Sequence, residues 1–130
     1  MAANTKRFVV DASFALAFLL PDEFHLKVDT TFKQFKEGKN DLFSTSLIYF
    51  EVINGLKSAS IQKRVSSSYC QKRLEEFLNY QINIYPVDFL EVFLLSEKTK
   101  LTPYDASYLY LSKTLSAPLL TLDKELKKHA

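Results

Sequence analysis

The amino-acid sequence predicts an α/β protein, a three-layer α/β/α sandwich around a central, mainly parallel sheet. Short apolar strands alternate with helical segments along the chain, and three of the strand patterns are apolar on both faces. Strands of this kind occur in parallel sheets that helices cover on both sides. Only two Gly and four Pro leave little material for the many turns of an all-β fold. The length of 130 residues favours one domain, residues 1–130, over two.

The first half of the chain divides into alternating strands and helices. Apolar residues recur three and four positions apart in the helical segments, and Gly38-Lys39-Asn40 breaks this pattern before the second strand. The expected elements are a strand over 7–10, a helix over 12–20 that Pro21 ends, a helix over 23–36, a strand over 41–44 and a helix from about Ser46 through Leu56.

The second half continues the alternation. A polar amphipathic helix is expected over 62–80, with Val65, Tyr69, Leu74, Phe77 and Leu78 facing inward. Thr102-Pro103 starts a later helix, because Thr is a good N-cap and Pro suits the first turn. The remaining expected elements are a strand over 82–85 that Pro86 ends, a helix over 89–99, the helix from Thr102 to about Leu115, a strand over 117–122 and a lysine-rich terminal helix.

The apolar run over 8–20, which follows two basic residues, has the composition of a signal peptide. Asp11 and Ser13 interrupt the run, and no small-x-small cleavage site follows it. Its thirteen residues are also too few to span a bilayer. We therefore expect a buried strand leading into a buried helix, in a cytoplasmic protein that does not associate with a membrane.

The composition limits the kinds of chemistry available. Seventeen Lys and Arg against fifteen Asp and Glu give a net charge of +2, too balanced for an overall basic nucleic-acid binder, so any such role must rest on local patches. Cys70 is the only cysteine, which excludes an internal disulfide and a thiolate zinc cluster. His25 and His129 lack partners at ligand spacing. Any metal ligands must therefore be carboxylates.

Four acids occupy positions where functional groups collect in parallel sheets, at the carboxyl ends of strands and the first turns of helices. Asp11 follows the first strand, Asp123 follows the last, Asp105 is the third residue of the helix that Thr102-Pro103 opens, and Glu51 lies one turn into another helix. Each also has a structural explanation, because Asp is a good N-cap and acids suit the first turn of a helix, while a glutamate at the rim can turn to water.

Taken together, the four acids favour a metal site. If they meet at one sheet edge, two carboxylates about 5 Å apart repel by roughly 3 kcal/mol at an effective dielectric constant of 20. Helix capping alone does not justify several such pairs. A bound divalent cation would justify them, because it offsets the repulsion. An all-oxygen ligand set suits Mg²⁺ or Mn²⁺ rather than zinc.

The same segments carry a family resemblance. The motifs are V-V-D-A-S-F-A-L over 9–16, E-V-I-N-G-L over 51–56, L-T-P-Y-D-A-S-Y-L over 101–109 and L-L-T-L-D-K-E-L over 119–126. In this order and spacing the chain resembles a PIN-domain ribonuclease, most closely the VapC-type toxins of prokaryotic toxin–antitoxin pairs. The resemblance implies a PIN-like fold for the whole chain.

The resemblance also implies residue roles. Asp11, Glu51, Asp105 and Asp123 fall where the family has its acidic metal-binding and catalytic residues. Ser13 and Thr121 fall at hydroxyl positions that line the same pocket, and Asn54 matches a polar position beside the glutamate. The implied reaction is the hydrolysis of RNA phosphodiester bonds by an endoribonuclease that depends on Mg²⁺ or Mn²⁺. Four carboxylates can hold one ion or two, and both remain open.

The family likeness further implies a homodimer and a cognate antitoxin whose tail occupies the acidic groove. Phosphate contacts could come from basic residues and base stacking from tyrosines, although solvated helix faces and core filling explain most of them equally well. These candidates are Lys57, Lys63, Arg64, Lys72, Arg73, Lys124, Lys127, Lys128, Tyr49, Tyr104 and Tyr108.

Other functions fit less well or remain open. A response-regulator receiver needs a second acid beside the first, and a haloacid-dehalogenase-type phosphatase needs D-x-D, but Val10 and Ser13 stand at those positions. A catalytically silent PIN-like module that binds RNA or a protein remains the alternative, because the sequence alone does not separate it from a ribonuclease.

Overall fold

The computed structural model describes residues 5–130, so the first four residues of the expected domain over 1–130 lie outside the described part. In chain order the elements are β1 (Lys6–Val10), α1 (Ala12–Leu19), α2 (Leu26–Lys36), β2 (Asn40–Ser44), α3 (Leu47–Ile61), α4 (Ser67–Leu78), β3 (Asn83–Ile84), α5 (Phe89–Thr99), α6 (Pro103–Leu115), β4 (Leu119–Leu120) and α7 (Lys124–Lys127). Within these residues, four parallel strands form one sheet in the order β3-β2-β1-β4. The predicted α/β class is confirmed.

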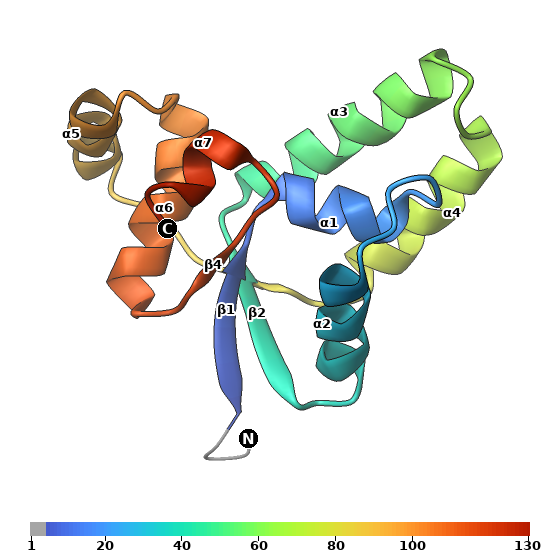
Figure 1. The fold of residues 1–130 in the computed structure, drawn as a ribbon, viewed down its shortest axis with the longest axis horizontal. Coiled ribbons are helices and arrows are strands. Elements are labelled where there is room, and N and C mark those ends of the chain that lie inside the picture. The colour runs from blue at the N-terminus through green and yellow to red at the C-terminus, as the bar shows by residue number, and fades with distance from the viewer. Residues whose placement is uncertain (1–4) are drawn as a thin grey trace.

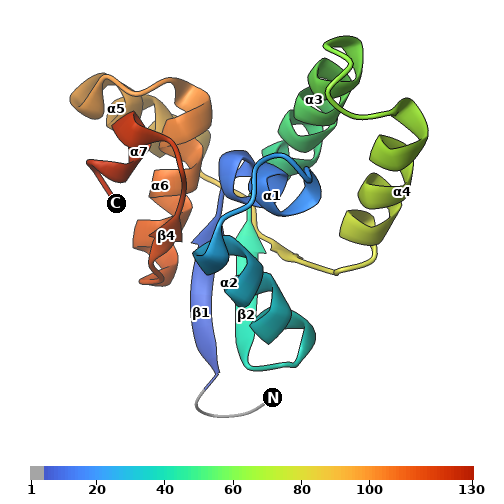
Figure 2. The same ribbon diagram turned by 45° about the vertical axis from the view of Figure 1, so that its right-hand side comes forward.

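Helices cover both faces of the sheet. Figures 1 and 2 show α1 to α4 on one side and α5, α6 and α7 on the other. On the first side α1 packs against α2 and α3, and α2 contacts β2; on the second side α6 packs on β1 and β4 and carries α5. The chain changes side after β3, and the segment through α5 and α6 returns it to β4 at the opposite edge. The result is the predicted three-layer sandwich.

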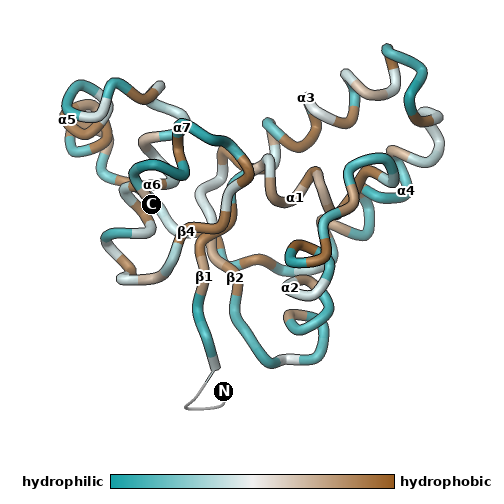
Figure 3. Tube along the Cα trace, viewed as in Figure 1, coloured by the Kyte–Doolittle hydropathy of each residue, from teal (hydrophilic) through white to brown (hydrophobic). Residues whose placement is uncertain are grey.

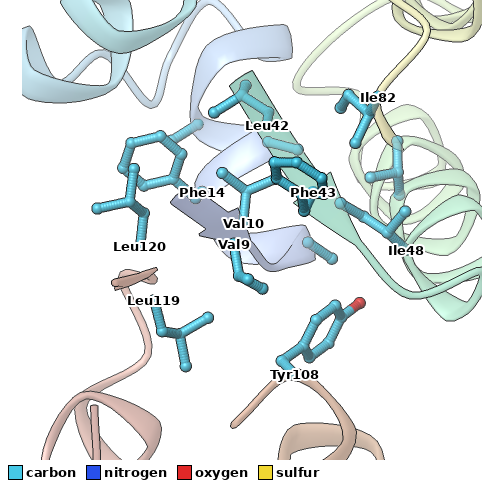
Figure 4. Packing of buried hydrophobic residues seen from close by; sticks show 14 of the residues in the cluster. Val9, Val10, Phe14, Leu42, Phe43, Ile48, Ile82, Tyr108, Leu119 and Leu120 are labelled. Carbon is cyan, nitrogen blue, oxygen red and sulfur yellow. The ribbon is translucent and has the colours of Figure 1, made fainter. Parts of the chain in front are cut away.

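The core lies where β1 pairs with both neighbours. Val9 is opposite Phe43 of β2 and Leu119 of β4, and Val9 and Val10 are fully buried. Figure 3 shows that the end of β1 nearest to α1 is hydrophobic while its first residues are hydrophilic. Figure 4 shows side chains from the strands, α1, α3 and α6 packed together there. The hydrophobic effect thus holds the carboxyl edge of the sheet together, where functional groups were expected.

The predicted helix over 62–80 is wrong at its start. α3 continues to Ile61, and the chain then turns over 62–66, with Lys63 in the left-handed region at φ 59°. The Ser66 hydroxyl accepts a hydrogen bond from the Tyr69 backbone N–H and starts α4 at Ser67. The helical spacing of apolar residues over 62–80 therefore continues across a turn, and the actual helix begins after the serine N-cap.

Two residues expected to face inward from this helix lie on the surface. Tyr69 is 38% and Leu78 50% exposed, whereas Phe77 is 1% exposed. α4 is the outer of two helices, since it packs on α3 and α1 and not on the sheet. Only a narrow face of it is buried, so two of its apolar positions have nothing to cover them.

Other boundaries differ at the edges of the fold. α2 begins at Leu26 and not at Glu23, which leaves Phe24 67% exposed outside the helix. The strands expected over 82–85 and 117–122 shrink to the two-residue β3 and β4. Each is an edge strand with one neighbour, and Thr121, the residue after β4, directs its hydroxyl to Asp11.

The apolar run over 8–20 divides as expected between the end of β1 and α1, which has eight residues. Across residues 5–130, no helix has both the length and the apolar character needed to cross a bilayer.

Candidate active site

A crevice lies between the neighbouring strands β1 and β4. The chain leaves β1 into α1 on one face of the sheet and leaves β4 toward α7 on the other. Ligands bind at such a switch point, outside the carboxyl ends of the strands. A pocket of about 450 Å³ opens there. We call it the acidic pocket, and its lining residues are Asp11, Ala12, Ser13, Leu16, Leu47, Phe50, Glu51, Asn54, Gly55, Tyr104, Asp105 and Asp123.

All four acids named from the sequence line this pocket. They come from the end of β1, from α3, from α6 and from the start of α7, so both helix layers contribute. None of the described residues that line the pocket is Lys, Arg or His. The negative charge therefore has no protein cation beside it in the lining.

Asp11 is both a helix cap and a member of the acidic pocket. It is 3% exposed. Its Oδ1 accepts hydrogen bonds from the Phe14 backbone N–H at 3.0 Å and the Ser13 hydroxyl at 2.8 Å, and its Oδ2 accepts one from the Thr121 hydroxyl at 2.5 Å. Burial raises the pKa of Asp11, and these hydrogen bonds oppose the rise. The capping explanation and the functional one are thus compatible at this residue.

The hydroxyls of Ser13 and Thr121 tie the ends of β1 and β4 together. Ser13 Oγ accepts from the Leu122 backbone N–H at 2.9 Å, and Thr121 Oγ1 accepts from the Asp123 backbone N–H at 3.0 Å. Ser13 lines the acidic pocket, but Thr121 does not: it is 5% exposed and lies behind Asp11. Thr121 therefore supports Asp11, and it does so from outside the lining of the acidic pocket.

The charges of the other three acids act on Asp105. Burial, followed by the charges of Asp123, Glu51 and Asp11, raises the pKa of Asp105 to about 6. Its backbone N–H donates to the hydroxyl of Thr102, the N-cap of α6, so the first turn of the helix holds the residue in place. The four carboxylates share one electrostatic environment that favours a proton or a cation.

Glu51 has a buried partner that sequence reasoning missed. The Tyr108 hydroxyl donates a hydrogen bond of 2.5 Å to Glu51 Oε1, and Tyr108 is only 1% exposed. Figure 4 shows its ring reaching from α6 into the core. Burial and this hydrogen bond raise the pKa of the Tyr108 phenol, which therefore remains a donor. Asp105 and Tyr108 lie three apart on one helix face, a spacing that could have indicated the role.

The carboxylates line one pocket without closing on a common point. Over residues 5–130, no group of three or more His, Cys, Asp or Glu side chains is arranged to hold a metal ion. Asn54 and Glu51 line the same pocket. The donor atoms are thus gathered around the pocket, and an ion would have to draw them together.

Residues 8–130 match the family model of the PIN domain, a stretch that includes all four acids. The chain belongs to the PIN-domain family. Two curated relatives are similar over most of their length. Ribonuclease VapC3 from Pyrobaculum aerophilum is 28% identical over 124 residues, 92% of this chain and 92% of its own. Ribonuclease VapC9 from Mycobacterium tuberculosis is 29% identical over 118 residues, 91% of this chain and 87% of its own.

A solved structure has the same fold as this PIN domain. The crystal structure of PAE2754 from Pyrobaculum aerophilum superposes with a TM-score of 0.78 at 24% sequence identity, over 100% of this chain and 88% of that one. The likeness supports the order of layers and strands described above.

Four of the RNA-contact candidates in this PIN domain have structural roles. Tyr108 is in the core, and Tyr49 packs edge-on against Phe77. Arg64 bonds to carboxylates of the α1–α2 loop, and Arg73 to backbone carbonyls at the end of α1. Of the three tyrosines, Tyr104 alone is both exposed, at 59%, and in the lining of the acidic pocket.

Proposed function

We propose that this PIN domain is a divalent-metal-dependent endoribonuclease of the VapC type, the toxin of a toxin–antitoxin pair, which hydrolyses RNA phosphodiester bonds. Its membership of the PIN family and its similarity to ribonucleases VapC3 and VapC9 support the ribonuclease and toxin assignment. The observation that carries the proposed metal chemistry is the acidic pocket, which four carboxylates line with no Lys, Arg or His among the described lining residues. An uncompensated group of this kind is costly to fold unless a ligand offsets it.

The donor set fits Mg²⁺ or Mn²⁺. Asp11, Glu51, Asp105 and Asp123 offer only carboxylate oxygens, and small hard divalent cations prefer oxygen ligands. Burial, together with the charges of the neighbouring carboxylates, raises the pKa of Asp105. We therefore assign these four residues to the binding of the ion. When bound there, such an ion supplies an activated water and stabilises charge on the phosphorus.

The chain's own residues orient the carboxylates for this task. Thr121, Ser13 and the Phe14 N–H fix both oxygens of Asp11, and Tyr108 fixes one oxygen of Glu51. Because Asp11 is 3% exposed, water competes little for its oxygens. Carboxylates held in this way lose little conformational freedom when an ion binds.

Cleavage of a mixed RNA pool tests the proposal. The purified protein should cut the pool with Mg²⁺ or Mn²⁺ and stop in excess chelator, and added Mn²⁺ should restore cutting. The Asp105→Asn variant, purified identically, controls for a contaminating nuclease and should lose about two orders of magnitude of activity. Isothermal titration with Mn²⁺ provides a readout that does not depend on cleavage.

Two results would contradict parts of the proposal. RNA binding without cleavage at any metal concentration would favour the catalytically silent PIN-like module. Equal cleavage by the parent and Asp105→Asn would assign the activity to a contaminant or to a site elsewhere.

We further propose partners and a compartment for this enzyme. RNA is the substrate, and a cognate antitoxin binds the acidic pocket through a segment that places an Arg or Lys among the carboxylates. The protein is proposed to act as a cytoplasmic homodimer. Light scattering on the purified chain, alone and with the product of an adjacent small gene, tests both assemblies.

A further inference from the structure

A second pocket adjoins the acidic pocket. Its volume is about 420 Å³, and it lies between the start of α3, the segment around the start of α5 and the start of α6. Leu47, Phe50 and Tyr104 line both pockets, so the two share a wall. The volume falls within the range of small-ligand sites, about 300–1,000 Å³. We call this second site the neutral pocket, because none of the described residues that line it is charged.

Exposed aromatic rings surround the neutral pocket. Phe50 is 75%, Phe89 84% and Tyr104 59% exposed. They come from α3, α5 and α6, three separate elements whose starts meet at this point. Exposed apolar side chains gathered on one surface commonly mark a binding site. Rings of this kind provide stacking surfaces for planar ligands.

The neutral pocket also contains a buried hydroxyl that lacks a partner among the described residues. Thr45 is 4% exposed, and its Oγ1 has no hydrogen-bond partner among residues 5–130. Ser46, the N-cap of α3, makes no side-chain capping hydrogen bond. Buried hydroxyls are almost always paired. A ligand with a polar edge that reaches this end of α3 would give the buried Thr45 hydroxyl a partner and could also reach the exposed Ser46 hydroxyl.

We propose that the neutral pocket binds the nucleobase of a nucleotide next to the phosphodiester bond that is cut. The proposal rests on the proposed function and names a specificity subsite for it. A base is planar, uncharged and polar at its edge, which matches aromatic walls, a lining without charged residues and the unpaired hydroxyl of Thr45. The shared wall means that RNA with a phosphate at the acidic pocket carries its neighbouring nucleoside across Phe50 and Tyr104.

The lining argues against the other parts of RNA as the occupant. A phosphate or a run of backbone needs Lys, Arg or a cation, and the described lining has none of these residues. A second copy of this chain is the competing occupant, because apolar surfaces also pair with one another. The position beside the acidic pocket favours the base, and the experiment below measures the assembly as well.

Phe89→Ala isolates the neutral pocket from the acidic one. Phe89 lines only the neutral pocket, and at 84% exposure its removal should leave the melting temperature unchanged within a few degrees. Phe93→Ala is the matched control. It removes the same side chain from the same helix, at 55% exposure, and Phe93 lines neither pocket.

The substrates are short single-stranded RNAs that are cut at one position. One RNA is intact, and two others each carry a single abasic nucleotide, placed directly before the cut in one and directly after it in the other. For the parent and Phe93→Ala, one of the two abasic changes should lower kcat/KM on the order of 10-fold. Phe89→Ala should cut the intact RNA on the order of 10-fold more slowly and be indifferent to that same abasic change. Loss of additivity between the protein change and the substrate change is the sign of direct contact.

The outcomes separate this proposal from the proposed function. If the parent cuts RNA but abasic changes have no effect, or their effects simply add to that of Phe89→Ala, the base pocket is overturned and the nuclease stands. If no RNA is cut, fluorescence anisotropy of the same RNAs in chelator decides. Tighter binding of the intact RNA that Phe89→Ala abolishes supports the pocket, and equal binding overturns it. If light scattering shows that both variants lose a dimer while the abasic changes have the same effect as in the parent, the face around the neutral pocket is assigned to contact with a second copy of this chain.

Discussion

The Tyr108 hydroxyl and Glu51 Oε1 join the two helix layers with a hydrogen bond of 2.5 Å between residues 57 positions apart. Tyr108 comes from α6 and Glu51 from α3, on opposite sides of the sheet. The second carboxylate oxygen, Glu51 Oε2, takes part in no hydrogen bond within residues 5–130. One carboxylate oxygen is thus fixed by the fold, and the other is left for a ligand of the acidic pocket.

Tyr108→Phe should weaken metal binding while the protein stays folded. The ring still fills the core, but Glu51 loses a donor, and a hydrogen bond to a charged group contributes about 1.5–3 kcal/mol at most. We expect the Mn²⁺ midpoint to rise several-fold and kcat to fall about 10-fold with KM little changed. Titration calorimetry and steady-state cleavage provide the two measurements.

Tyr110→Phe is the matched control for this change. Tyr110 lies on the same helix, is half-buried and faces a groove beside α5, away from the acidic pocket. It should bind Mn²⁺ like the parent. If Tyr108→Phe also binds Mn²⁺ like the parent, the hydrogen bond has only a structural role.

Asp11→Asn separates capping from metal binding. Asn caps a helix about as well as Asp, so the Phe14 and Ser13 hydrogen bonds can persist. Removing one charge from a repelling group should stabilise the metal-free protein by about 1 kcal/mol. Metal-induced stabilisation should shrink, and cleavage should fall about 100-fold or more. A variant that cuts RNA and responds to metal like the parent would leave Asp11 as a helix cap alone.

Divalent ions should raise the melting temperature, because they bind the folded acidic pocket and not the unfolded chain. A free concentration 100 times the dissociation constant adds about 2.7 kcal/mol, which corresponds to roughly 10 °C for a domain of this size. Sodium chloride at matched ionic strength controls for screening. A flat melting temperature across a Mn²⁺ titration would count against the site.

The metal-free protein should become more stable as the pH falls from 7 toward 5. The pKa of Asp105 is about 6 in the folded state and near 3.9 in an unfolded chain, so the folded state binds more protons between these values. Stability then rises as the pH falls, and the raised pKa of Asp11 acts in the same direction. Because Asp105 is partly exposed, we expect about 1 kcal/mol from it after screening.

Urea unfolding in chelator at several pH values measures this trend. Asp105→Asn should flatten it, since the variant has no proton to gain at that position. Stability of the parent that only declines from pH 7 to 5 would show that the acids do not repel one another.

The sequence predicted the sheet and most helices because their signals are local. Asp11, Thr102 and Asp123 each cap the helix that follows, and each was recognisable from its neighbours. The error over 62–80 arose because Ser66 lies in a polar stretch where the apolar spacing continues through the turn. Contacts with distant residues also hold the turn after α3, because Arg64 in this turn bonds to Asp22 and Glu23 in the α1–α2 loop.

The candidate site divides in the same way. The four acids were found because they lie beside strand ends and helix starts, positions that the topology brings together. Tyr108 was missed as a partner of Glu51 because their contact depends on how α6 and α3 pack around the sheet edge. The hydrogen bond from the Thr121 hydroxyl to Asp11 is likewise a contact between residues far apart in the sequence, so the spacing of the motifs does not show it.

The position of β4 has a consequence for the timing of synthesis. Asp11 and Glu51 leave the ribosome early, but Thr121, which holds Asp11, and Asp123 belong to the last strand and the residues directly after it. A partly translated chain therefore has carboxylates without the strand that orders them. A ribonuclease built in this way gains its complete site only after nearly all of this domain has been translated.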